Sequence, residues 1–125
     1  MHNQKLIEIL TEGEDGAVAI ATQGADGPHV VNTWNSYVII DDEGRLLIPA
    51  GRMQRTEENL GSDDRIVVTI ASRQVVGLRY PGTGMLIHGR AAFVSDGPSY
   101  TTIKERFVWA RAALVITIES SELTL

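Results

Sequence analysis

Two stretches of this sequence carry residue types that could bind a small molecule. The first covers residues 32–37, which read Asn-Thr-Trp-Asn-Ser-Tyr inside a run of strand-forming residues. In a strand, alternation puts Asn32, Trp34 and Ser36 on one face. Asparagine is a poor strand former, so its amides are expected to serve a purpose, and an amide suits the O=C–N–H edge of a heterocycle. The alternative is a polar strand on an open face, with Trp34 as a core anchor.

The second stretch covers residues 51–58, which follow a predicted strand and begin a predicted helix. Free backbone N–H groups at a helix start, together with the Thr56 hydroxyl, the Arg55 guanidinium and a second arginine, suit a phosphate monoester. Ser72 and Arg73 follow the next strand and could add a hydroxyl and a cation. The alternative is a pair of surface arginines balanced by the glutamates one turn further along. Together, the two stretches predict a site for a phosphorylated heterocycle.

Patterns typical of catalytic or metal centres are missing from the sequence. His2, His29 and His88 are scattered without metal-ligand spacing, so no metal is expected. The chain has no cysteine, which excludes disulfides and thiolate chemistry. It has no G-x-S-x-G nucleophile motif. Residues 82–84 (Gly-Thr-Gly) predict a tight turn, because a dinucleotide-binding motif would need its third glycine where Ile87 stands. Catalytic residues stay unassigned.

Composition sets the class of protein. The chain has 125 residues, 43% hydrophobic and 22% charged, which predicts one globular domain over residues 1–125. A net charge of −5 argues against nucleic acid as a partner. Apolar runs are far shorter than the ~20 residues of a membrane span, and the first residues lack a signal-peptide pattern. We therefore expect no membrane partner and a cytoplasmic location.

Turn signals divide the chain into short strands and helices. Helices are expected over 3–12, with Asn3 as the N-cap, over 56–60, and from Pro98 onward. Residues 73–84 are expected to form a loop. Six strands are expected over 17–22, 29–40, 45–49, 66–71, 85–94 and 113–118. Hairpin-length turns between them indicate a mainly β fold, a six-stranded antiparallel barrel with short peripheral helices.

Several segments together resemble a known family. The sequence is similar to the small dimeric FMN-binding proteins of the pyridoxamine 5′-phosphate oxidase-like FMN-binding split-barrel superfamily. Segments 32–36 and 109–117 are quite specific to this superfamily, whereas the glycine turns also occur in many other proteins. The matching segments cover nearly the whole length and are 17–24, 31–37, 53–57, 81–84, 109–117 and 124–125.

The resemblance implies a six-stranded split barrel that forms a homodimer, with one FMN per subunit near the interface. It assigns Asn32, Thr33 and Trp34 to the flavin and ribityl chain. It implies that Arg55 and Thr56 hold the phosphate. The family often has Lys at the position of Arg55, and Arg keeps the positive charge but changes the shape of the charged group. The resemblance also implies Tyr37 and Trp109 near the isoalloxazine and Leu125 reaching the flavin of the other subunit. Ser72 and Arg73 join the expected cofactor-binding residues on their residue types alone.

The function implied is electron transfer by a non-covalent, redox-active FMN to an unidentified redox partner protein. The alternative is an NAD(P)H-dependent flavin reductase or small oxidoreductase of the same superfamily, and a third reading is a module that binds a small ligand without redox work. Pyridoxamine phosphate oxidation is not expected, because the oxidase's Arg-X-His is replaced by Arg-Ala-Ala at 111–113. Acids such as Glu14 or Asp15, if close to the flavin, would lower its potential.

Overall fold

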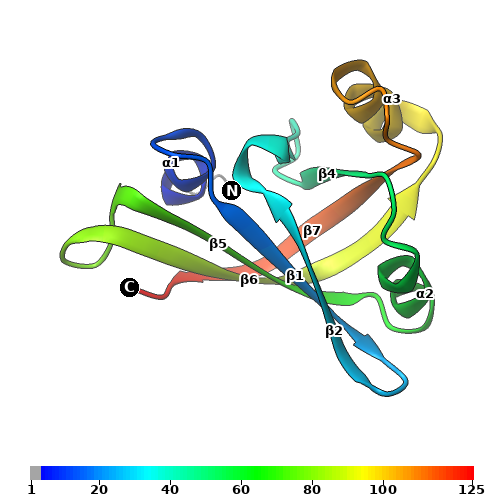
Figure 1. Ribbon diagram of the computed structural model, residues 1–125, viewed down its shortest axis with the longest axis horizontal. Coiled ribbons are helices and arrows are strands. Elements are labelled where there is room, and N and C mark those ends of the chain that lie inside the picture. The colour runs from blue at the N-terminus through cyan, green and yellow to red at the C-terminus, as the bar shows by residue number, and fades with distance from the viewer. Residues whose placement is uncertain (1–3) are drawn as a thin grey trace.

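Within residues 4–125, which are the residues described by a computed structural model of the chain, seven strands form one antiparallel sheet (Figure 1). The sheet order is β2-β1-β5-β6-β7-β4-β3. The predicted cap Asn3 and His2 lie outside the described residues. The elements in chain order are α1 (Gln4–Thr11), β1 (Ala17–Gly24), β2 (Gly27–Trp34), the 3₁₀ helix η1 (Asn35–Tyr37), β3 (Ile39–Ile40), β4 (Leu46–Ala50), α2 (Gln54–Ser62), β5 (Arg65–Val76), β6 (Pro81–Val94), α3 (Gly97–Arg106) and β7 (Ala112–Leu123).

The long strand predicted over 29–40 is wrong, because η1 divides it into β2 and β3. Asn35 causes the break. Its buried Nδ2 donates hydrogen bonds to the carbonyl oxygens of Ile9 (3.2 Å) and Ala71 (2.9 Å), and its backbone N–H donates to the Gly16 carbonyl (2.7 Å). These three bonds hold the chain in a tight turn, so the sheet has seven strands where the sequence predicts six.

The loop predicted over 73–84 is also wrong, because most of it continues the β5–β6 hairpin. Ser72 pairs with Thr83, and after an irregularity Val76 pairs with Pro81. Proline is tolerated there because it is the first residue of β6, where a missing N–H costs no ladder bond. The glycine and proline signals are real, but they mark the tip of a long hairpin.

The sheet bends around its core, and the split-barrel fold class is confirmed. A register shift between His88 and Gly89 interrupts the β6–β7 ladder, and a Cβ on Gly89 would lie 2.3 Å from the Thr117 carbonyl oxygen. Only glycine permits this close approach, which lets β6 curve across the barrel. The buried interior includes Ile9, Val18, Ile20, Ile48, Ile66, Val68, Ile87, Leu114 and Ile116.

The helices lie around the sheet and fix the segments between strands (Figure 1). The buried face of α1 closes the core against β5 and η1. Helix α2 packs on β1 and β6, and α3 packs on β7 and β4. A second apolar cluster, Leu47, Ile103, Phe107, Ala110 and Ala113, anchors α3. No helix among residues 4–125 is long and apolar enough to cross a lipid bilayer.

Candidate functional site

Three aromatic rings gather where α3 returns to the sheet. Tyr37 ends η1, Phe107 follows α3, and Trp109 lies in the turn before β7. The ring centroids of Tyr37 and Phe107 are 5.1 Å apart, and Trp109 lies 5.8 Å from Tyr37 and 5.7 Å from Phe107. Phe107 is buried, whereas Trp109 is 51% exposed. The two inner rings therefore support a tryptophan that presents apolar surface to solvent.

The Trp109 ring lies against the segment that begins α2. A Cβ on Gly51 would be 3.1 Å from Trp109 Cε3, so glycine allows the backbone to run beside the ring. Two residues later, Met53 adopts a left-handed conformation with φ of 70° and turns the chain into the helix. No side chain among the described residues caps α2. Its first N–H groups are therefore open to an anion.

Thr56 stands in the first turn of α2 and is 1% exposed. Its Oγ1 is buried and has no hydrogen-bond partner among residues 4–125. Arg55 beside it is exposed, with its Nε 3.8 Å from a carboxylate oxygen of Glu58, a loose pairing that leaves the guanidinium able to turn. An unpaired buried hydroxyl, open helical N–H groups and an available cation are what an oxyanion needs.

Arg111, which is not among the site residues predicted from the sequence, also reaches the start of α2. Its Nη2 donates to the Arg52 carbonyl oxygen (2.7 Å), and its Nη1 lies 2.9 Å from Glu57 Oε1. Its Nε is buried without a partner in the described part of the chain, and its guanidinium carbon lies 5.7 Å from the centre of the Phe93 ring. The sequence signal that could have identified Arg111 is its position two residues after Trp109, within segment 109–117, which is specific to the resembled superfamily.

The side chains at the end of β2 alternate between exposed and buried as predicted, as far as Asn35. Asn32, Trp34 and Ser36 are exposed and Thr33 is buried. Trp34 is 49% exposed and lies opposite Ala17 in the ladder, so it is not a core anchor. Asn32 donates from Nδ2 to the Val18 carbonyl (3.2 Å). The Nδ2 groups of both asparagines donate to backbone carbonyl oxygens, so these two donors serve the fold.

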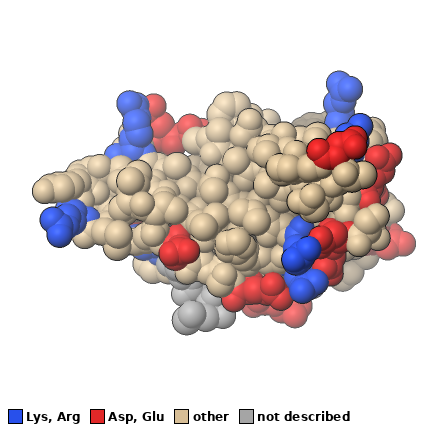
Figure 2. All heavy atoms as spheres, turned by 90° about the horizontal axis from the view of Figure 1, so that it is seen from below, with Lys and Arg blue, Asp and Glu red and all other residues tan. Residues whose placement is uncertain are grey.

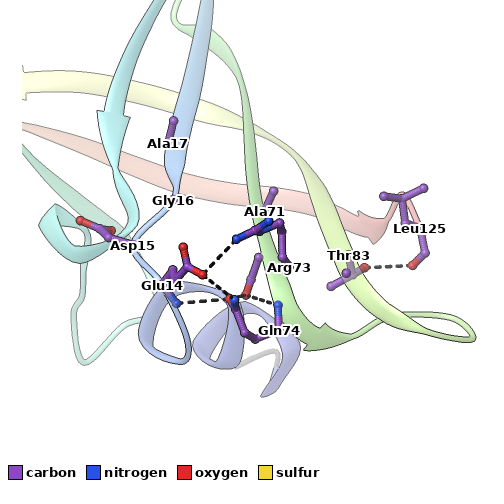
Figure 3. Close-up of a pocket in the computed structure, with 11 residues that line it drawn as sticks. Glu14, Asp15, Gly16, Ala17, Ala71, Arg73, Gln74, Thr83 and Leu125 are labelled. Atoms are coloured by element: carbon purple, nitrogen blue, oxygen red, sulfur yellow. Dashed lines mark hydrogen bonds and ion pairs between the residues drawn. The ribbon is translucent and has the colours of Figure 1, made fainter.

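Ser72, Arg73 and Leu125 line a separate cavity of 330 Å³ between the start of β1 and the β5–β6 hairpin (Figure 3). Arg73 Nη2 lies 3.0 Å from Glu14 Oε1, which also accepts a hydrogen bond from Gln74. The Leu125 carbonyl oxygen accepts a hydrogen bond from Thr83 Oγ1 (2.9 Å), and Leu125 as a residue is 67% exposed. The cavity is thus lined by the ion pair of Arg73 and Glu14 and by the apolar side chain of Leu125.

Two groups of the predicted cofactor residues lie apart in the chain. The cavity beside Leu125 and the start of α2 lie toward opposite ends of the long axis (Figure 1). Ser72 and Arg73 therefore cannot join Arg55 and Thr56 around one phosphate in the same chain. The face seen in Figure 2 has a broad uncharged area across its middle, with charged side chains at its left end, on its right side and along its lower edge.

Comparison with known proteins identifies the family. The family model described as pyridoxamine 5′-phosphate oxidase matches residues 4–123. The chain belongs to this family. A member with 57% identity over 111 residues is the FMN-binding protein of Nitratidesulfovibrio vulgaris (strain DSM 19637 / Miyazaki F), a match that covers 89% of this chain and 90% of that protein.

Solved structures share the family's fold at low sequence identity. HupZ of Group A Streptococcus has a TM-score of 0.79 and 16% identity, covering 99% of this chain and 94% of the other. An FMN-binding protein of Syntrophomonas wolfei subsp. wolfei has a TM-score of 0.71 and 13% identity, covering 98% and 85%. At these identities the likeness establishes the split-barrel fold of the pyridoxamine 5′-phosphate oxidase family and nothing further.

Proposed function

We propose that this chain binds FMN non-covalently and serves as an electron-transfer flavoprotein. The observation that carries the proposal is the start of α2, where open N–H groups, the guanidinium of Arg55 and the buried hydroxyl of Thr56, which has no partner among residues 4–125, come together. The 57% identical relative is an FMN-binding protein, which gives the same cofactor independently.

The phosphate of FMN fits the chemistry at the start of α2. An unsatisfied buried hydroxyl costs roughly 1–3 kcal/mol, and an oxyanion would remove that cost by accepting from Thr56 Oγ1. The helix dipole favours negative charge at this end, and Arg55 can turn from Glu58 toward the ligand. In this arrangement the chain recognises a phosphate monoester through one hydroxyl, one cation and the backbone.

The flavin ring requires a flat apolar surface beside the phosphate site. Trp109 borders the segment leading into α2 and rests on Tyr37, and we propose that both rings face the isoalloxazine. Asn32, Thr33 and Trp34 would line the ring and the ribityl chain. When bound, FMN supplies one- and two-electron transfer, and the protein sets its orientation, its exposure to water and its potential.

We further propose a homodimer in which the cavity end of one subunit meets the α2 end of the other. Ser72, Arg73 and Leu125 lie toward the other end of the long axis from the start of α2, so they would reach the flavin from the second chain. Large exposed hydrophobic side chains offer apolar contact area: Val30, Trp34, Val76, Leu78, Tyr80, Val108, Trp109 and Leu125. Flavin binding and dimerisation would then stabilise each other.

The oxidase reaction of the family is not part of the proposal. Where the oxidase carries Arg-X-His, this chain has Ala113, which is fully buried and pairs with Pro49 and Val94 inside the sheet. A side chain at that position faces the packed core and has no route to a substrate. We therefore favour electron transfer over pyridoxamine phosphate oxidation. The location proposed for this electron-transfer protein is the cytoplasm.

An anaerobic titration tests the proposal. The purified protein is expected to show two flavin absorption bands that bleach stepwise on reduction and return with an electron acceptor. A colourless protein that takes up no added FMN would refute the binding site. Steady turnover of NADH with a free acceptor would instead identify a flavin reductase, and flavin that binds without reversible reduction would leave a binding module.

A further inference from the structure

Arg111 joins the two segments that form the start of α2. One terminal nitrogen of its guanidinium holds the carbonyl of Arg52, before the helix, and the other holds the carboxylate of Glu57, within the first turn. Its guanidinium carbon lies 5.7 Å from the centre of the Phe93 ring on β6, a cation–π contact that holds the side chain against the sheet. Because both terminal nitrogens are engaged, Arg111 acts on this site through Arg52 and Glu57.

Glu57 needs such a restraint because it is an acid in the first turn of α2. A carboxylate there is attracted to the helix N-terminus and can act as an internal substitute for an anionic ligand. It would also repel a phosphate dianion placed nearby. In the structure the carboxylate is half-exposed and faces Arg111 at 2.9 Å, so its charge is compensated and its position is fixed.

We propose that Arg111 is a positioning residue that keeps Glu57 away from the phosphate site and thereby makes the site prefer a phosphorylated flavin over an unphosphorylated one. This inference rests on the proposed FMN site at α2. It predicts that Arg111 matters for FMN and hardly at all for riboflavin, which has the same ring and ribityl chain without the phosphate. It also predicts that the effect of losing Arg111 depends on the charge of Glu57.

The test compares dissociation constants for FMN and riboflavin, measured by flavin fluorescence with the full chain. Arg111→Met keeps an unbranched side chain of similar length and removes the charge. We expect it to weaken FMN roughly tenfold and to change riboflavin by less than about twofold. Adding Glu57→Gln to this variant is expected to restore FMN affinity to within about threefold of the wild type.

Arg55→Ala is the matched control, because it removes a cation that we place on the phosphate itself. It is expected to weaken FMN without rescue by Glu57→Gln. Thermal melting without flavin is measured for each variant to check that it folds. If Arg111→Met does not fold, Arg111→Lys replaces it. The lysine variant should lose part of the preference for FMN and regain it with Glu57→Gln.

Equal weakening of FMN and riboflavin, or an Arg111 variant that Glu57→Gln fails to rescue, would overturn the positioning role and leave Arg111 as a structural residue. A wild-type protein that binds no FMN refutes the proposed function, and the inference with it. A wild-type protein that binds FMN while Arg111→Met binds it equally well refutes the inference alone.

Discussion

Thr56→Val should make the flavin-free protein more stable and a poorer FMN binder. The substitution keeps the shape of a side chain that is almost fully buried and removes a hydroxyl without a partner among the described residues. Leaving such a hydroxyl unpaired costs roughly 1–3 kcal/mol, so we expect the free energy of unfolding to rise by about 1 kcal/mol. For a chain of 125 residues this corresponds to about 4 °C in melting temperature.

The same substitution should weaken FMN by about 2 kcal/mol, roughly 30-fold, because a hydrogen bond to a charged phosphate oxygen is lost. Riboflavin should bind as before. Thr22→Val is the matched control, since Thr22 is also buried but its Oγ1 accepts a hydrogen bond from Asn59 Nδ2 at 3.1 Å. It should lower the free energy of unfolding by about 1 kcal/mol and leave the preference for FMN unchanged.

Thermal melting without flavin and fluorescence titrations with FMN and riboflavin measure both effects. If Thr56→Val destabilises the protein as much as Thr22→Val does, the hydroxyl has a partner and the reasoning fails. If the stability rises but FMN binds unchanged, the hydroxyl does not face the phosphate.

Three further outcomes are expected. Trp34→Ala should loosen FMN by roughly 1–3 kcal/mol with little change in melting temperature, because the ring is half-exposed; unchanged affinity would remove it from the flavin site. Glu14→Gln should raise the midpoint potential of bound FMN by roughly 10–30 mV in a spectroelectrochemical titration, and no shift would place the acid far from the ring. The hydrogen bond from Arg65 lowers the pKa of Asp63 from 3.8 to about 2. Its folded pKa lies below the unfolded one, so its stabilising effect is complete above about pH 4 and is lost as the pH falls to about 2. Melting curves of Asp63→Asn should therefore depend less on pH across that window.

The sequence predicted the elements whose pattern depends on local residues. Pro98 marks the start of α3, where Asp96 stands at the N-cap, and the helix predicted over 3–12 forms as α1. The alternation from Asn32 to Asn35 agrees with the observed burial. These signals need no knowledge of distant segments, because capping and periodicity are properties of neighbouring residues.

The missed features depend on contacts between distant segments. The turn at Asn35 exists because carbonyl groups of Ile9 and Ala71 meet its amide, and no local pattern reveals those partners. The extension of β5 to Val76 depends on pairing with Pro81 across a glycine-rich tip. Arg111 enters the site because β7 lies beside β4 and carries it to the segment before α2.

The hydrogen bonds of Asn35 also determine how fast its backbone amide proton exchanges with solvent. Its side chain binds residues 26 and 36 positions away in sequence, and its backbone N–H binds the chain just before β1. Opening the turn locally would detach helix α1 and strand β5 from it at the same time. Its amide proton should therefore exchange with solvent only when the whole barrel unfolds, as slowly as the protons of the central strands. A turn at the edge of the site would then share the kinetics of the core.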